Sequence, residues 1–262
     1  MPKIAITTMP RSGSSYYAKL LRMMYTENDP GRSREGEWSQ NDSWVIKVHE
    51  PILLLANVPE MVQTMILRNP VDNVASIVNK SSYGFGASTI IGRPEIVEDN
   101  IKRLLDDKQK WINEAIFQEL HMWMGYTYNM MKNIDNIIPY TFEQLVEKEN
   151  EVLTSFTYEI GQENLVEIPT VDSIKNEKNN WSQELLHDIN HSSGSANLLP
   201  IKKSEMYEEI KNSVISNKYI NEAWSMYKEA IGLIETRQSK YKVPLAGIEP
   251  ATLGLEVQRS VH

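Results

Sequence analysis

A short run of arginine, serine and glycine residues near the start of the chain has the composition of an anion-binding loop. The run follows an apolar segment and consists of Arg11, Ser12, Gly13, Ser14 and Ser15. Serine hydroxyls, one guanidinium and the unpaired N–H groups at the start of a helix are donors that proteins use to hold phosphate. The sequence therefore predicts a phosphate-binding loop at residues 10–15.

A lysine and a histidine stand two positions apart at the end of the next apolar run. In a strand over 44–49, Lys47 and His49 point to the same face, because strand side chains repeat every two residues. A histidine with a pKa near neutrality can remove the proton from an acceptor hydroxyl. We therefore expect two nitrogen side chains, one of them able to take up a proton, on the same face at this strand end.

Arg68 and Ser76 form a third candidate cluster. Arg68 follows the apolar segment 61–67, and Asn69-Pro70 supplies the N-cap and N1 residues that begin a helix. Ser76 falls in the second turn of that helix, near enough to Arg68 for both side chains to meet one ligand. The pair predicts an oxyanion site.

The elements that must position these residues alternate between apolar strands and amphipathic helices. Strands are predicted at 3–8, 44–49, 61–67 and 136–140, and helices after 13, from 70, within 94–132, from 142 to 159 and over 204–237. The last of these helices is expected to pack on the sheet. The alternation indicates an α/β fold with a doubly wound parallel sheet flanked by helices.

The chain length of 262 residues and the apolar fraction of 41% suffice for one sizeable core. We expect one domain over 1–242 with mobile loops at 26–43, 81–93 and 172–199. The segment 243–262 contains two prolines and no periodic pattern, and it is expected to be a disordered tail.

Charge and cysteine content limit the partners and the chemistry. A formal net charge of -8 argues against nucleic acid or an anionic membrane as partner. The sequence has no cysteine, so it offers no disulfide, thiolate nucleophile or zinc–thiolate site. No apolar run approaches the roughly 20 residues that span a bilayer. We expect a cytoplasmic protein with a small substrate and without a metal site, and its oligomeric state stays open.

The loop around Gly13 lacks the residues that a nucleoside triphosphatase needs. Such loops begin with glycine and carry a lysine directly after their last glycine, and neither is present here. The strands at 44–49 and 61–67 are followed by no aspartate suited to hold Mg²⁺. A P-loop phosphotransferase or kinase is therefore the second choice among enzymes.

In order and spacing, three segments resemble the motifs of sulfotransferases that use 3′-phosphoadenosine 5′-phosphosulfate (PAPS). They are Pro10-Arg11-Ser12-Gly13-Ser14-Ser15, Lys47-Val48-His49-Glu50-Pro51 and Arg68-Asn69-Pro70-Val71-Asp72-Asn73-Val74-Ala75-Ser76. Phe142-Glu143-Gln144-Leu145 is similar to the Tyr-Glu-Asp-Leu segment after the family's fourth strand. The resemblance covers residues 3 to about 160 and implies a P-loop NTPase-like sulfotransferase architecture.

The resemblance also implies roles in donor binding. The loop from Arg11 to Ser15 would hold the 5′-phosphosulfate, Arg68 and Ser76 the 3′-phosphate, and Tyr16 would stack on adenine. For the transfer itself, His49 would be the general base and Lys47 would neutralise the transferred sulfuryl group. Some family branches with Pro-Arg-Ser-Gly in the loop use a glutamate on the following loop as base, so Glu37 is the alternative to His49.

The implied reaction moves a sulfuryl group from PAPS to a hydroxyl, or as second choice an amine, of a small-molecule, glycan or peptide acceptor. Negative charge shifts toward the leaving phosphate during this transfer, and Arg11 is placed to stabilise it. The basic Arg-Lys-Gly segment near the family's C-terminal end has no match here. A non-catalytic nucleotide-binding protein of the same fold is therefore a further alternative.

Overall fold

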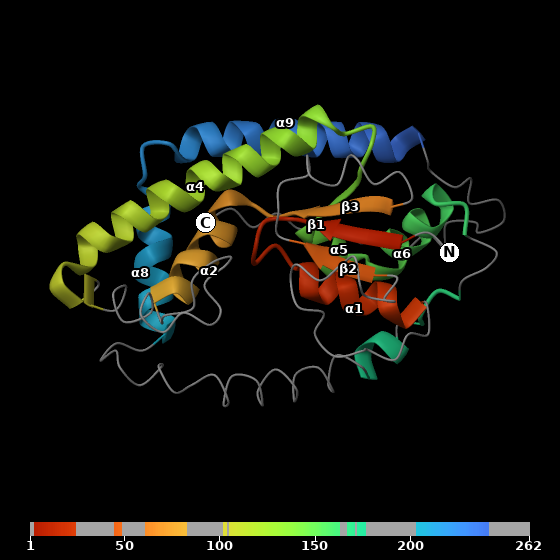
Figure 1. Cartoon of the computed structure of the whole chain (residues 1–262), viewed down its shortest axis with the longest axis horizontal. Helices are drawn as coiled ribbons and strands as arrows, with labels where there is room; N and C mark the ends of the chain where they lie inside the picture. Colours follow the sequence, from red (N-terminus) through yellow and green to blue (C-terminus); the bar gives the residue numbers. More distant parts are fainter. Residues whose placement is uncertain are drawn as a thin grey trace, which may run out of the picture.

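A computed structural model describes the residues 3–24, 45–48, 61–82, 102–103, 105–162, 167–170, 172–176 and 203–240. They form a mixed α/β fold with a parallel sheet flanked by helices (Figure 1), which confirms this part of the predicted fold class. Within these ranges, no helix is both long and apolar enough to cross a membrane.

Four parallel strands form the sheet in this part of the chain, in the order β2-β1-β3-β4. Their bounds are Lys3–Thr7 for β1, Val45–Val48 for β2, Met61–Leu67 for β3 and Ile138–Thr141 for β4. Ile4 of β1 lies opposite Val45 on one side and Val62 on the other. The chain thus moves outward from β1 in both directions, and the strand order reverses between β1 and β3.

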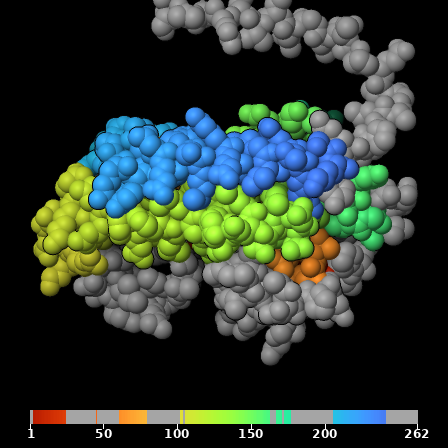
Figure 2. Space-filling view, turned by 90° about the horizontal axis from the view of Figure 1, so that it is seen from above, coloured from red at the N-terminus to blue at the C-terminus, as the bar shows by residue number. Residues whose placement is uncertain are grey.

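Helices cover both faces of the sheet. Their bounds are α1 Ser14–Met24, α2 Pro70–Ser82, α4 Lys108–Lys132, α5 Phe142–Glu147, α6 Glu149–Glu159, α8 Lys203–Ile215 and α9 Ile220–Lys240. In β3, Ile66 packs with α1, α5 and α6, whereas Met65 and Leu67 pack with the other four helices. Both faces of β3 are therefore apolar, as expected for a central parallel strand. Figure 2 shows α9 lying alongside α4 on the outer surface.

Local signals in the sequence set several helix starts. Asn69 caps α2, because its Oδ1 accepts a hydrogen bond of 2.9 Å from the N–H of Asp72. Thr141 caps α5 in a capping box with Gln144, whose side chain accepts from the N–H of Thr141. The cap at Asn69 confirms the helix start that was predicted from Asn69-Pro70.

Two predicted helices are each divided in two. The helix expected over 142–159 breaks at Lys148 into α5 and α6, and the one expected over 204–237 breaks into α8 and α9. In the second break, the side chain of Asn217 accepts from the N–H of Tyr219 at 3.0 Å, and such local bonding competes with helix continuation. After this break, α8 packs mainly on α2 and α4, and α9 contacts β4 of the sheet.

The predicted loops are described only at their edges. Helix α2 extends through Ser82, and residues 172–176 are helical, so the ends of the loops predicted at 81–93 and 172–199 are ordered as helix. The rest of these loops, the loop at 26–43 and the tail at 243–262 lie outside the described residues.

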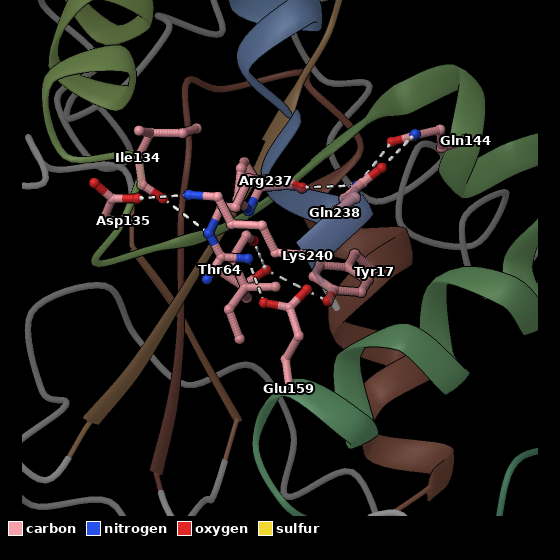
Figure 3. Close-up of polar contacts among 11 residues, drawn as sticks. Tyr17, Thr64, Ile134, Asp135, Gln144, Glu159, Arg237, Gln238 and Lys240 are labelled. Atoms are coloured by element: carbon pink, nitrogen blue, oxygen red, sulfur yellow. Dashed lines mark hydrogen bonds and ion pairs between the residues drawn. The ribbon is translucent and has the colours of Figure 1, made fainter. Parts of the chain in front are cut away.

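The end of α9 is fastened to the edge of the sheet by polar contacts (Figure 3). Arg237 forms a buried ion pair with Glu159 of α6, and its Nε donates to the carbonyl of Ile134 at 2.8 Å. Gln238 bonds to the carbonyl of Pro139 and to Gln144 of α5. These contacts support α5, from which Phe142 reaches the loop after β1.

Glu119 on the inner face of α4 is a buried carboxylate. The residue is 8% exposed, and its Oε2 has no hydrogen-bond partner in the described part of the chain. Burial raises the pKa of Glu119 to about 7, because desolvation disfavours the charged form.

The stability of the Glu119→Gln variant should therefore depend less on pH than that of the wild-type protein. The unfolded carboxyl ionises near its ordinary pKa of 4.5, so the stability of the wild-type protein falls as pH rises from there through about 7. Between pH 5 and pH 8, the free energy of unfolding measured in urea should rise by about 2 kcal/mol in the variant relative to wild type. A parallel Glu229→Gln variant at the exposed surface of α9 is the control. If the free energy of unfolding depends on pH in the same way for wild type and Glu119→Gln, the raised pKa of Glu119 is contradicted.

Candidate anion-binding site

Two predicted phosphate-binding segments follow neighbouring strands. Arg11 lies in the loop after β1, and Arg68 directly follows β3. In parallel α/β sheets, ligands bind at the carboxyl ends of strands where the strand order reverses, and here that point is between β1 and β3. The topology therefore places both arginines at the edge where such folds hold their ligands.

The loop after β1 has a tightly fixed backbone. Arg11 has φ 66 and Gly13 has φ 95, both in the left-handed region. The buried hydroxyl of Ser12 donates to the carbonyl of Met9 at 2.8 Å. A non-glycine residue at positive φ costs energy and persists where the surroundings determine it, which is common at ligand sites.

Asn73 of α2 ties this loop to the helix after β3. Its Nδ2 donates to the carbonyl of Pro10 at 3.0 Å and lies 3.2 Å from the hydroxyl oxygen of Ser12. Asn73 is fully buried. The sequence motif contained this residue, but sequence reasoning gave it no role, since its partners lie 61 and 63 positions away.

Arg68 is held from three sides. Its carbonyl accepts from the indole N–H of Trp123 at 3.0 Å, and its Nη1 donates to the carbonyl of Arg11 at 3.0 Å. The guanidinium also lies over the ring of Phe142, 4.6 Å from the ring centroid. Phe142 was noticed only as part of a motif, and the structure identifies it as a supporting residue of the site.

The guanidinium groups of Arg11 and Arg68 lie near enough to act on each other electrostatically. Nε of Arg11 donates to Oγ of Ser76 at 3.1 Å, and Arg68 donates to the carbonyl of Arg11, so Arg11 contacts both of the other residues. Partial burial of its guanidinium and the like charge of Arg68 lower the pKa of Arg11. Neither arginine forms an ion pair with a carboxylate among the described residues. An anion bound here would relieve the repulsion between them.

Three further residues predicted for the phosphate-binding loop lie at the start of α1. Ser14 begins α1 and is buried, Ser15 is exposed, and the hydroxyl of Tyr16 donates to Oε1 of Glu149 at 2.8 Å. Tyr16 is thus anchored to α6, and its proposed contact with adenine stays a prediction.

The predicted catalytic residues after β2 are described only in part. Val48, the last residue of β2, lies opposite Thr7, so β2 ends beside the loop that carries Arg11. The backbone of Lys47 lies opposite Ile6 in the same pair of strands. His49 and Glu37 lie outside the described residues, and their roles stay predictions.

No protein-family model and no curated protein sequence matches this chain. The interpretation of the site therefore depends on its residues and their geometry.

Proposed function

We propose that this chain is a PAPS-dependent sulfotransferase with the P-loop NTPase-like architecture of that family. The observation that carries the proposal is that Arg11 contacts both Ser76 and Arg68 at the point where the strand order reverses. A cluster of cationic and hydroxyl donors without a paired carboxylate suits a ligand rich in phosphate. PAPS carries a phosphosulfate at the 5′ position and a phosphate at the 3′ position.

In the proposed reaction, the acceptor oxygen forms a bond to sulfur while the bond from sulfur to the 5′-phosphate oxygen breaks. The acceptor proton goes to a base, for which His49 is the first candidate and Glu37 the alternative. Adenosine 3′,5′-bisphosphate leaves with the negative charge that develops on its phosphate oxygen. Arg11 and the N–H groups of its loop stabilise that charge, and Lys47 neutralises the sulfuryl group in transit.

Thermal unfolding with candidate nucleotides tests the choice of ligand. Adenosine 3′,5′-bisphosphate should raise the Tm more than ATP with Mg²⁺ or NAD does, because a ligand that binds the folded state stabilises it. A larger shift with ATP and Mg²⁺ would instead favour a P-loop phosphotransferase and contradict the proposal.

Transfer of labelled sulfate from PAPS to a panel of hydroxyl and amine acceptors tests the activity itself. The panel should include small molecules, glycans and peptides, because the residues that select the acceptor are not specified by the motifs. Tight bisphosphate binding without transfer to any acceptor would favour a non-catalytic nucleotide-binding protein. For an active acceptor, separate His49→Ala and Glu37→Ala variants identify the base by which of them loses turnover.

Arg68→Ala should weaken the binding of adenosine 3′,5′-bisphosphate by about 30-fold, because hydrogen bonds to charged groups contribute about 1.5–3 kcal/mol. Calorimetry measures the affinity. The affinity for adenosine 5′-phosphate should fall less in the variant, because this nucleotide lacks the 3′-phosphate. Arg103→Ala, which removes an exposed ion pair with Glu114, is the control. Wild-type affinity in Arg68→Ala would remove Arg68 from the phosphate site.

A further inference from the structure

Helix α8 brings two polar side chains to the first turn of α2. Nζ of Lys211 lies 2.9 Å from Oδ1 of Asp72, and the hydroxyl of Tyr207 lies 3.5 Å from the same oxygen. No motif in the sequence pointed to either residue of α8. The contact matters because the first turn of α2 directly follows Arg68.

Helix geometry brings Lys211 close to the anion-binding residues. Asp72 and Ser76 are four residues apart on α2, so they lie on one face with their Cβ atoms about 5–6 Å apart. Ser76 accepts the hydrogen bond from Arg11. Lys211 therefore contacts the residue that lies one helical turn before the serine that Arg11 contacts.

The charges in this region act on one another. Partial burial opposes ionisation of Asp72, but hydrogen bonds from Asn69 and Lys211 and the charges of Lys211 and Arg68 outweigh it, so the pKa of Asp72 is lowered. The charge of Arg68 also acts on Tyr207. Asp72 thus stands between two cations that belong to different elements, Arg68 after β3 and Lys211 on α8.

Lys211 is free to change its partner. Its side chain is 35% exposed, and that of Asp72 is 30% exposed, so their ion pair is in contact with solvent. Exposed pairs of this kind contribute little to stability. A phosphate held by Arg68 and Ser76 would carry more negative charge than one carboxylate and would compete for the same ammonium group.

We propose that Lys211 is a third cation of the 3′-phosphate site, paired with Asp72 in the free protein and attracted to the phosphate when the nucleotide binds. The inference rests on the proposed function and adds a phosphate-binding residue from α8. The competing explanation is that Lys211 only anchors α8 to α2 and affects the site through Asp72.

Calorimetry on Lys211→Ala tests the assignment. The variant should bind adenosine 3′,5′-bisphosphate about tenfold more weakly than wild type, with little change for adenosine 5′-phosphate. Lys108→Ala is a matched control: Lys108 forms a 2.7 Å ion pair between α4 and α8 and is similarly exposed, at 38%. The control should keep wild-type affinity for both nucleotides, and Lys211→Arg should retain most of the affinity for the bisphosphate.

A double-mutant cycle with Asp72→Asn separates direct from indirect action. If Lys211 contacts the phosphate, its replacement by alanine weakens bisphosphate binding at least as much in the Asp72→Asn background as in wild type. If Lys211 acts only through Asp72, the replacement has no effect in that background, and the inference is overturned. Equal affinities for Lys211→Ala and Lys108→Ala overturn it as well and leave the proposed function intact. If the wild-type protein does not bind the bisphosphate, both the inference about Lys211 and the proposed function are overturned.

Discussion

Replacing Arg11 by alanine should lower the rate of sulfuryl transfer by about a thousandfold, because donors aimed at developing charge contribute about 10²- to 10³-fold each and Arg11 also carries a full charge. In the proposed reaction, negative charge moves onto the leaving phosphate, so the interaction with Arg11 is stronger in the transition state than in the bound donor. Interactions of this kind raise turnover more than affinity. Turnover of labelled PAPS at saturating acceptor measures the effect.

The affinity for adenosine 3′,5′-bisphosphate distinguishes this role from simple donor binding. We expect a loss of affinity well below the loss of turnover, because Arg68 and Ser76 still hold the 3′-phosphate. Arg11→Lys keeps the charge but not the planar group that reaches Ser76, so it should retain part of the activity. Equal losses of affinity and turnover in Arg11→Ala would show that Arg11 binds the ground state and the transition state alike.

The parts of the fold that the sequence predicted are those with local signals. β3 was predicted with its observed bounds, Met61–Leu67, because a run of apolar residues ends at Arg68 and is followed by the capping pair Asn69-Pro70. Local propensity and helix geometry suffice for such statements. The convergence of Arg68 and Ser76 on one ligand stays a prediction; the structure shows Ser76 accepting from Arg11 and Arg68 donating to the carbonyl of Arg11.

The missed parts depend on contacts between distant segments. Asn73 holds the loop after β1, Phe142 lies under Arg68, and Lys211 reaches Asp72 from α8. A single sequence gives no signal for these pairs, because nothing in the residue types specifies which helix faces which loop. The break between α8 and α9 was missed because the apolar period continues on both sides of Asn217, whose side-chain bond ends the regular pattern.

The largest loss of stability is expected for Gly13→Ala. Gly13 has φ 95, and an added Cβ would lie 2.6 and 2.8 Å from two carbons of the Phe142 ring. Arg68 lies over the same ring, so a shift of the ring would also disturb its contact with the guanidinium. A side chain at positive φ costs about 1–2 kcal/mol, and overpacking adds about 1–3 kcal/mol, so we expect a loss of about 3–4 kcal/mol in urea unfolding.

Two other glycines separate these two costs. Gly161 has φ 66 but open space around its Cβ position, so Gly161→Ala should cost only the backbone term of about 1 kcal/mol. Gly125 lies inside α4 with nothing within 4 Å, and Gly125→Ala should stabilise the protein by about 0.5–1 kcal/mol. The difference between the losses of stability in Gly13→Ala and Gly161→Ala then measures the cost of the contact with Phe142. Equal costs at the two positions would mean that Phe142 does not confine the loop, which Asn73 would then hold without the help of this ring.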